Sequence, residues 1–302
     1  MADMGVNICG VAFKNPVIAA SGTFGFGREY QNFYDVSLLG GISVKGLTRL
    51  KRQGNPPARV AETPSGMLNS VGLQNPGVEA FIADDLPWLK QQGTVIIANM
   101  AGACEDDYVY MADRLSHSDV DMMEMNISCP NVKEGGVAFG TRPESIYNIV
   151  KLTKPAAKKP LIVKLSPNVA DIAECARAAE EAGADAISLI NTLTGMAVDV
   201  YKKKPLLANI VGGLSGPAVR PVALRMVWQA SRAVNVPVIG MGGIMTGEDA
   251  AAFMLCGASA VMVGTANIHD PMACVNIIDE LEKYCDATGV NAVSELTGAL
   301  EV

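Results

Sequence analysis

The residues best suited to chemistry lie at positions 125–131, which read MNISCPN. An apolar run ends at Asn126, and Ser128 and Cys129 follow directly before Pro130. A proline at this point cannot continue a ladder of backbone hydrogen bonds, and it holds the chain in a turn. We therefore expect an amide and a thiol together at the exit of a buried strand, where parallel α/β proteins carry their catalytic groups.

Eight short apolar runs are candidates for the strands that position these groups. Each run is continuously apolar rather than alternating, as expected for strands buried on both faces. They cover residues 17–20, 41–44, 95–98, 121–125, 161–163, 186–190, 238–241 and 260–263. Helical segments are expected between them at 79–91, 106–116, 143–156, 168–182, 217–234, 246–256 and 272–287, with Thr246 as a helix N-cap and Gly183 as a helix C-cap.

This succession of strands and helices predicts a (β/α)8 TIM barrel, with residues 1–302 forming a single domain. Two connections are unusually long, at about 48–77 and 131–142, and we expect them to be inserted active-site loops or lids. A doubly wound open sheet is the competing architecture. The glycines of SGTFGFG after the first run do not have the GxGxxG spacing of a dinucleotide-binding turn, which favours the barrel.

The composition narrows the class of protein. The chain is 49% hydrophobic with a net charge of −7, which argues against a nucleic-acid partner or an acidic membrane surface. We expect no signal peptide, membrane anchor or membrane-spanning stretch. The seven cysteines include no CxxC pair, which predicts a cytoplasmic protein with free thiols. With two histidines and no metal-ligand spacing, no metal site is predicted.

Polar residues and glycines follow the runs at their carboxyl ends, which meet at one mouth of a barrel. We expect the following to lie together there: Ser21, Lys45, Asn99, Asn126, Lys164, Asn191, Thr192, Gly242, Gly243, Gly264 and Thr265. A buried lysine must be paired or lose its charge, and no acidic residue ends any of the runs. We therefore expect an anionic ligand to supply the missing charge. The plainer interpretation of any single residue is that it caps a helix or reaches solvent.

The glycines that follow the last two runs suggest a phosphate site, because glycine permits close approach of backbone N–H groups to an anion. The mouth offers amides and lysines but no strand-end histidine or carboxylate, which suits neither metal-dependent hydrolysis nor two-carboxylate chemistry. It suits a cofactor that carries its own reactivity, and flavin mononucleotide (FMN) fits. Cys129 would be the acid/base or nucleophile beside it, aided by a lysine cation; otherwise its thiol is a small buried apolar group.

A set of motifs along essentially the whole chain resembles the soluble, cytosolic class of dihydroorotate dehydrogenases. They are SGTFGFG, SVKGLT, RVAETPSGMLNSVGLQNPG, MNISCPN, IVKLSPN, SLINT, GGLSGPA, IGMGGI and VMVGT. Within that class, NSVGLQNPG and AETPSGM are similar to the subclass that passes electrons to NAD rather than to fumarate. The resemblance implies oxidation of (S)-dihydroorotate to orotate in de novo pyrimidine (UMP) biosynthesis.

The resemblance also implies residue roles. FMN would be held by Ser21, Lys45, Gly46, Asn99, Asn126, Lys164, Ile190, Gly216, Gly242, Gly243, Gly264 and Thr265. Dihydroorotate would be held by Lys45, Asn69, Ser70, Val71, Gly72, Leu73, Asn126, Asn191 and Thr192. Cys129 would be the catalytic base that removes a carbon-bound proton, while hydride passes from the neighbouring carbon to FMN. Lys45 would offset charge on the substrate.

In the NAD-linked class a second subunit carries FAD and an iron–sulfur cluster. This chain has no cysteine cluster of the kind such a centre needs. The resemblance implies a homodimer of this chain joined by the electron-transfer subunit, in a heterotetramer. Three alternatives stay open: a fumarate-dependent (class 1A) dihydroorotate dehydrogenase, a Schiff-base aldolase with Lys164 or Lys45 as nucleophile, and a non-catalytic flavin- or phosphate-binding protein.

Overall fold

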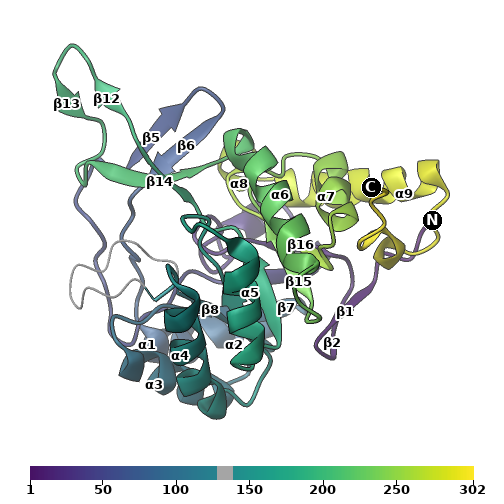
Figure 1. Cartoon of the computed structure of the whole chain (residues 1–302), viewed down its shortest axis with the longest axis horizontal. Helices are drawn as coiled ribbons and strands as arrows, with labels where there is room; N and C mark the ends of the chain where they lie inside the picture. Colours follow the sequence, from purple (N-terminus) through teal and green to yellow (C-terminus); the bar gives the residue numbers. More distant parts are fainter. Residues whose placement is uncertain (128–138) are drawn as a thin grey trace.

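The fold is a closed barrel of eight parallel strands surrounded by helices (Figure 1). The structure is a computed structural model that describes residues 1–127 and 139–302. Around the barrel the strands are β3 (Val17–Ala19), β4 (Gly41–Ser43), β7 (Val95–Met100), β8 (Met122–Asn126), β9 (Leu161–Lys164), β10 (Ala186–Leu189), β15 (Val238–Met241) and β16 (Ala260–Val263). The predicted (β/α)8 barrel is confirmed, and the open doubly wound sheet is wrong.

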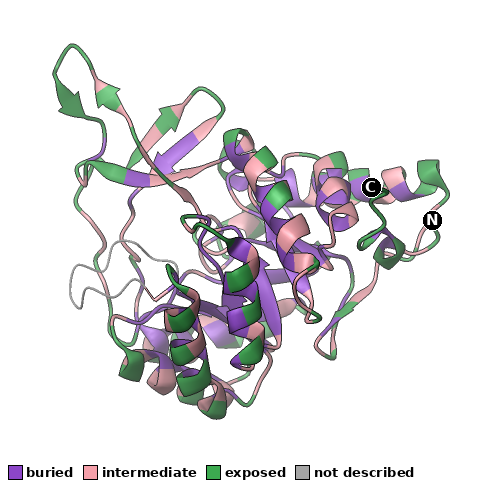
Figure 2. Cartoon of the chain, in the orientation of Figure 1, coloured by how far each residue is buried: buried purple, intermediate pink, exposed green. Residues whose placement is uncertain are grey.

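Helices cover the outside of the barrel and bury one side against it (Figure 2). They are α1 (Val78–Ala80), α2 (Leu86–Lys90), α3 (Glu105–Ser116), α4 (Pro143–Thr153), α5 (Ile172–Glu181), α6 (Arg220–Ser231), α7 (Gly247–Leu255), α8 (Ala266–His269) and α9 (Ala273–Thr288). A π-helical turn, Phe81–Asp85, joins α1 to α2. At α7 the predicted cap is confirmed: the Thr246 side chain accepts from the backbone N–H of Asp249.

Some predicted helix boundaries are wrong. Helix α5 begins at Ile172 rather than at 168, because the Asp171 carboxylate accepts from the N–H groups of Ala173 and Glu174 and caps the helix there. The predicted helices at 143–156 and 217–234 are shorter than expected. The first ends in a 3-10 turn, Lys154–Ala156, and the second begins with one, Pro217–Val219.

Three further groups of strands were not predicted. An antiparallel hairpin of β1 (Val6–Ile8) and β2 (Val11–Phe13) packs Ile8 and Phe13 into the apolar interior of the barrel. A four-stranded antiparallel sheet has the order β11 (Leu193–Met196), β14 (Val211–Ser215), β6 (Gly66–Asn69) and β5 (Val60–Thr63). Strands β5 and β6 lie within the connection predicted as an inserted loop at 48–77. Glycines and half-exposed residues in these strands hide the apolar pattern that marks the barrel strands.

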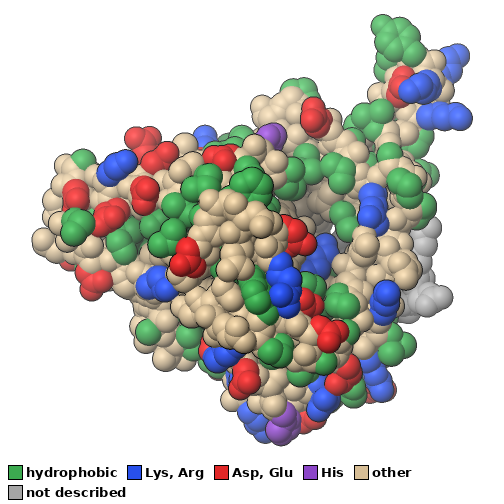
Figure 3. All heavy atoms as spheres, turned by 180° about the vertical axis from the view of Figure 1, so that it is seen from behind, with side chains coloured by type: hydrophobic (Ala, Val, Ile, Leu, Met, Phe, Trp, Pro, Cys, Tyr) green, Lys and Arg blue, Asp and Glu red, His purple; other side chains and the backbone are tan. Residues whose placement is uncertain are grey.

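A two-stranded arm, β12 (Val198–Asp199) and β13 (Lys204–Pro205), extends beyond this small sheet. Figure 3 shows it projecting from the body of the molecule, with basic side chains at its tip. These are the consecutive lysines 202–204, next to Tyr201, which is almost fully exposed.

The interior of the barrel changes from apolar to polar along its axis. Ile97, Met122, Ile162 and Ala186 belong to one apolar cluster inside the barrel. Two positions further along the same strands come Asn99, Glu124, Lys164 and Ser188, all buried. Because side chains two residues apart in a strand share a face, this second set forms a polar layer directly above the apolar one.

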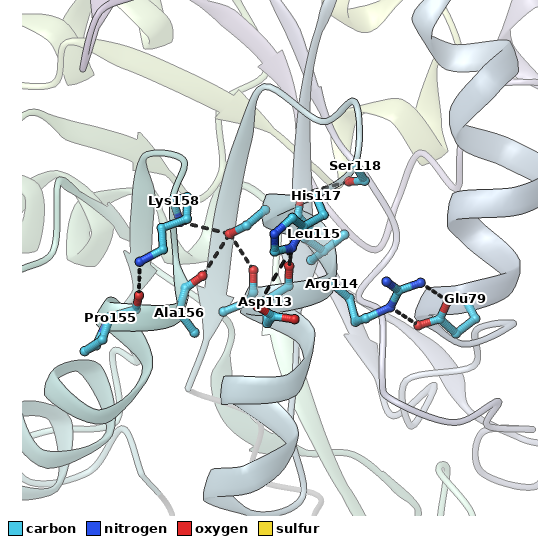
Figure 4. A network of polar contacts seen from close by, with 11 residues as sticks. Glu79, Asp113, Arg114, Leu115, His117, Ser118, Pro155, Ala156 and Lys158 are labelled. Atoms are coloured by element: carbon cyan, nitrogen blue, oxygen red, sulfur yellow. Dashed lines mark hydrogen bonds and ion pairs between the residues drawn. The ribbon is translucent and has the colours of Figure 1, made fainter.

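On the outside of the barrel, polar contacts tie α3 to its neighbours (Figure 4). The Arg114 guanidinium donates to both oxygens of the Glu79 carboxylate, at 2.6 and 2.7 Å. At the end of α3, the Ser116 hydroxyl accepts from the Lys158 backbone N–H at 2.8 Å. The hydrogen bonds from Arg114 lower the pKa of Glu79 from about 4.5 to about 2.

This shift makes the stability of the protein depend on pH in a defined window. Because the Glu79 pKa is lower in the folded state, the carboxylate contributes stability above about pH 4.5, and this is lost as the pH falls toward about 2. We expect Glu79→Gln to lower the melting temperature slightly at neutral pH, as is usual for an exposed pair, and the difference from wild type to vanish in acid. Thermal unfolding between pH 7 and 2 tests this, with the exposed Glu62→Gln as a control. A difference that is independent of pH would contradict it.

Candidate active site

A pocket opens at the carboxyl ends of the barrel strands and extends under the small four-stranded sheet. The barrel contributes strand-end residues such as Lys164 and Gly242, while Met67 and Asn69 come from β6 and Gly213–Ser215 from β14. The small sheet therefore forms one wall of the pocket, opposite the mouth of the barrel. Loops after the strands complete the lining.

Most of the predicted site residues line this pocket. They are Ser21, Lys45, Gly46, Asn69, Val71, Gly72, Leu73, Asn126, Lys164, Ile190, Asn191, Thr192, Gly216, Gly242, Gly243, Gly264 and Thr265. Their roles toward FMN or dihydroorotate remain predictions. Cys129 and most of the lid predicted at 131–142 lie outside the described residues.

Two predicted residues do not line the pocket. Asn99 was expected directly after a strand, but β7 continues to Met100, so the Asn99 side chain lies inside the barrel in the polar layer. Ser70 follows the lining residue Asn69 and is buried. Its hydroxyl has no hydrogen-bond partner within residues 1–127 and 139–302.

One side of the pocket carries side-chain amides whose orientation is fixed by neighbours. The Asn191 amide nitrogen donates to the Asn126 side-chain oxygen at 3.4 Å. The Asn191 oxygen accepts from the Thr192 backbone N–H at 2.7 Å. The Tyr108 hydroxyl of α3 donates to the backbone carbonyl of Asn126 at 2.9 Å, which holds the end of β8. This side is therefore a preorganised set of hydrogen-bonding groups for a polar ring.

The other side is made of close backbone segments. Gly242 and Gly243 have φ angles of +129° and +82°, which side chains of L-residues rarely allow. A Cβ atom on Gly243 would lie 2.7 Å from the carbonyl oxygen of Gly216. Nearby, the Thr265 hydroxyl donates to the Ser215 hydroxyl at 2.8 Å. Backbone groups packed this closely fit a compact anion such as a phosphate.

Lys164 was expected to lack a negatively charged partner within the protein, but it has one. Its ammonium nitrogen lies 3.9 Å from the Glu124 Oε2 atom, and Glu124 is completely buried. The expectation that a ligand supplies the missing negative charge is thus wrong for this lysine. Glu124 does not follow a strand end: it lies within β8 and faces the barrel interior. The signal was a carboxylate within the otherwise apolar segment MMEM, residues 122–125.

Other lining residues were also missed. Met67, Leu214 and Ser215 belong to the small sheet, which was not predicted, and Met241 and Met262 lie at the ends of barrel strands. Methionines there resemble ordinary core residues in a sequence. Without the pairing of β6 with β14, nothing in the sequence indicates that Ser215 comes close to Thr265.

Comparison with known proteins gives the family. A sequence model of the family described as "Dihydroorotate dehydrogenase" matches residues 3–285. The chain belongs to the dihydroorotate dehydrogenase family. The family membership predicted from the motifs is confirmed, and the aldolase and the purely ligand-binding alternatives are not supported.

Two dihydroorotate dehydrogenases are similar to this chain over its whole length. The chain is 57% identical over 298 residues to a protein of Alkaliphilus oremlandii, and the match covers 99% of each chain. It is 54% identical over 303 residues to a protein of Bacteroides thetaiotaomicron, covering all of both chains. Each relative is named "Dihydroorotate dehydrogenase B (NAD(+)), catalytic subunit".

A solved structure supports the dihydroorotate dehydrogenase fold. It is described as DHODH in complex with ferulenol, from Eimeria tenella, and superposes with a TM-score of 0.81 over 98% of this chain and 88% of that chain. At 22% identity this likeness concerns the fold alone. In the described parts of this family member, no helix is long and apolar enough to cross a membrane.

The glycine side of the pocket can be tested by substitution. We expect Gly243→Ala to destabilise the protein by about 2–4 kcal/mol, because it adds a steric clash with Gly216 to the strain of a positive φ angle. Gly93→Ala is the matched control: Gly93 has a φ of +66° but no atom within 4 Å of an added Cβ. Gly93→Ala should lower the free energy of unfolding by about 1–2 kcal/mol, from the backbone strain alone. Urea unfolding compares the two, and equal losses would contradict the close approach.

Proposed function

We propose that this chain is the catalytic subunit of an NAD-linked dihydroorotate dehydrogenase, which oxidises (S)-dihydroorotate to orotate in pyrimidine (UMP) biosynthesis. The observation that carries the proposal is the 57% identity, over 99% of both chains, to a protein named as such a catalytic subunit. The pocket is consistent with it, because it combines an amide-lined side with a glycine-lined side. We further propose a cytoplasmic protein in which residues 1–302 form a single barrel domain.

The groups around the pocket fit FMN. The glycine turns offer backbone N–H groups to one phosphate, and Lys164 offers a cation to a polar ring edge. The Asn99 side-chain oxygen is buried without a hydrogen-bond partner in the described part of the chain, next to the lining residue Gly46. Such an oxygen is costly to leave unpaired, and a ligand N–H would satisfy it. When bound, FMN supplies a hydride acceptor.

We assign FMN binding to the predicted set, in which all residues except Asn99 line the pocket. Asn126, Asn191 and Thr192 orient the dihydroorotate ring, with the 69–73 segment on the small-sheet side. Lys45 offsets the negative charge of the substrate. Cys129, three residues after Asn126, is the base that takes the carbon-bound proton. By fixing the ring relative to this base, these residues contribute to the rate through orientation.

We propose that a partner subunit carries FAD and an iron–sulfur cluster and passes electrons to NAD, in a heterotetramer built on a homodimer of this chain. The word "subunit" in the names of the relatives supports a partner. The fumarate-dependent reaction is disfavoured, because those names specify NAD(+). A Schiff-base reaction at Lys164 is disfavoured by the ion pair with Glu124, since a protonated amine is not a nucleophile.

The cofactor, reaction and base can be tested in one experiment. We expect the purified chain to show flavin absorption that bleaches when dihydroorotate is added without oxygen. Cys129→Ala should bleach at least about a hundredfold more slowly, because general-base catalysis contributes a factor of that order. Cys104→Ala is the control, since Cys104 is an exposed cysteine that does not line the pocket. A protein that binds no FMN would refute the proposal, and unchanged bleaching in Cys129→Ala would require another base.

The electron acceptor needs a separate measurement. We expect the chain alone, supplied with dihydroorotate, to turn over neither NAD nor fumarate at an appreciable rate, because the groups that reduce NAD belong to the partner. Addition of the partner subunit should restore NAD reduction. Steady fumarate reduction by the chain alone would instead identify the fumarate-dependent reaction.

A further inference from the structure

Glu124 is a buried carboxylate for which the proposed reaction has no direct use. It is completely inaccessible to solvent, and it lies on β8 in the polar layer of the barrel. An isolated carboxylate in such a place is very unfavourable, so it must be compensated by hydrogen bonds and a positive charge. The structure provides both kinds of compensation, from four other strands.

The hydrogen bonds come from three side chains. The hydroxyls of Ser43 on β4 and Ser188 on β10 donate to Glu124 at 2.8 and 2.7 Å. The Asn99 amide nitrogen on β7 donates at 2.5 Å. The positive charge is Lys164 on β9, with its ammonium nitrogen 3.9 Å from the carboxylate. Glu124 therefore joins residues of β4, β7, β9 and β10, and two of these, Asn99 and Lys164, belong to the predicted FMN set.

The contact with Asn99 decides which end of that amide is left for a ligand. A carboxylate accepts hydrogen bonds and cannot donate them, so the amide must turn its nitrogen toward Glu124. Its oxygen then lies on the other side, where a Cβ atom on the lining residue Gly46 would be 3.0 Å away. This oxygen is one of the buried side-chain atoms that have no hydrogen-bond partner among the described residues.

We propose that Glu124 is a positioning residue for the cofactor: it fixes Asn99 so that the side-chain oxygen faces the ligand, and it holds Lys164 as a paired cation at the pocket. This rests on the proposed binding of FMN. The flavin ring edge carries one N–H between two carbonyl groups, so one acceptor and one cation match it. The negative charge of Glu124 also limits how positive the pocket is, and thereby how strongly the pocket favours reduction of the cofactor.

The decisive variant is Glu124→Gln, which has nearly the same shape but no charge. A glutamine oxygen can take the place of Oε2 and accept from Asn99 and Ser43, while its nitrogen donates to the Ser188 hydroxyl, so this variant removes the charge and leaves Asn99 in its orientation. Glu124→Leu instead leaves the Asn99 nitrogen without its acceptor, and here we expect FMN affinity of the apoprotein to fall at least about tenfold. In Glu124→Gln the lost charge is the change that matters. We also expect the two-electron reduction equilibrium of bound FMN to shift about tenfold toward the reduced form, a rise in midpoint potential of about 30 mV.

Two further variants separate positioning from simple structural support. Ser188→Ala removes one hydrogen bond to the same carboxylate without changing its charge, so it should lower stability but leave the midpoint potential near that of wild type. Glu124→Asp keeps the charge and should also keep the potential. If Glu124→Gln does not fold, these two carry the test, and a tenfold shift of the reduction equilibrium in Glu124→Asp would overturn the inference.

The outcomes distinguish this inference from the proposed function. FMN titration and a reductive titration against a reference dye are performed on wild type first. If wild type binds no FMN, the proposed function and this inference both fail. If wild type binds FMN and is bleached by dihydroorotate, but Glu124→Gln matches it in midpoint potential and Glu124→Leu matches it in FMN affinity, only the role of Glu124 is refuted.

Discussion

The Glu124 carboxylate imposes a constraint that several strands must satisfy at the same time. A buried carboxylate needs donors on all sides, and here they come from Ser43, Asn99 and Ser188, with the Lys164 ammonium nearby. Removing any one partner leaves a buried polar group uncompensated, which is generally more costly than the net gain of forming the contact. The polar layer therefore depends on the register of five neighbouring barrel strands.

The division of the barrel interior into two layers links folding to function. The lower layer, with Ile97, Met122 and Ile162, is apolar and closes the barrel together with the β1–β2 hairpin. The upper layer carries the charges and amides that border the pocket. The apolar core and the lining of the pocket thus occupy different levels of the same strands, as is general for barrels of this kind. The small sheet adds a second wall without disturbing either level.

The family membership gives chemical meaning to this arrangement. A dihydroorotate dehydrogenase must orient a small ring between a base and a hydride acceptor, which requires rigid polar groups rather than a large set of reactive ones. The linked amides of Asn126 and Asn191 and the tightly packed turn at Gly243 are rigid in this sense. The proposed base, Cys129, follows from the sequence motif MNISCPN and from the family, not from the geometry of the described residues.

The sequence alone determined the barrel, because eight continuously apolar runs with intervening helices leave few other ways to bury them. It also identified most of the residues that line the pocket, since strand ends converge in any such barrel. Tertiary structure alone decided the small sheet, in which Asn69 pairs with Gly213, 144 residues away. It also decided the partner of Lys164: a linear pattern does not show that Glu124 faces inward, and the register in which β8 pairs with β9 brings the two charges together.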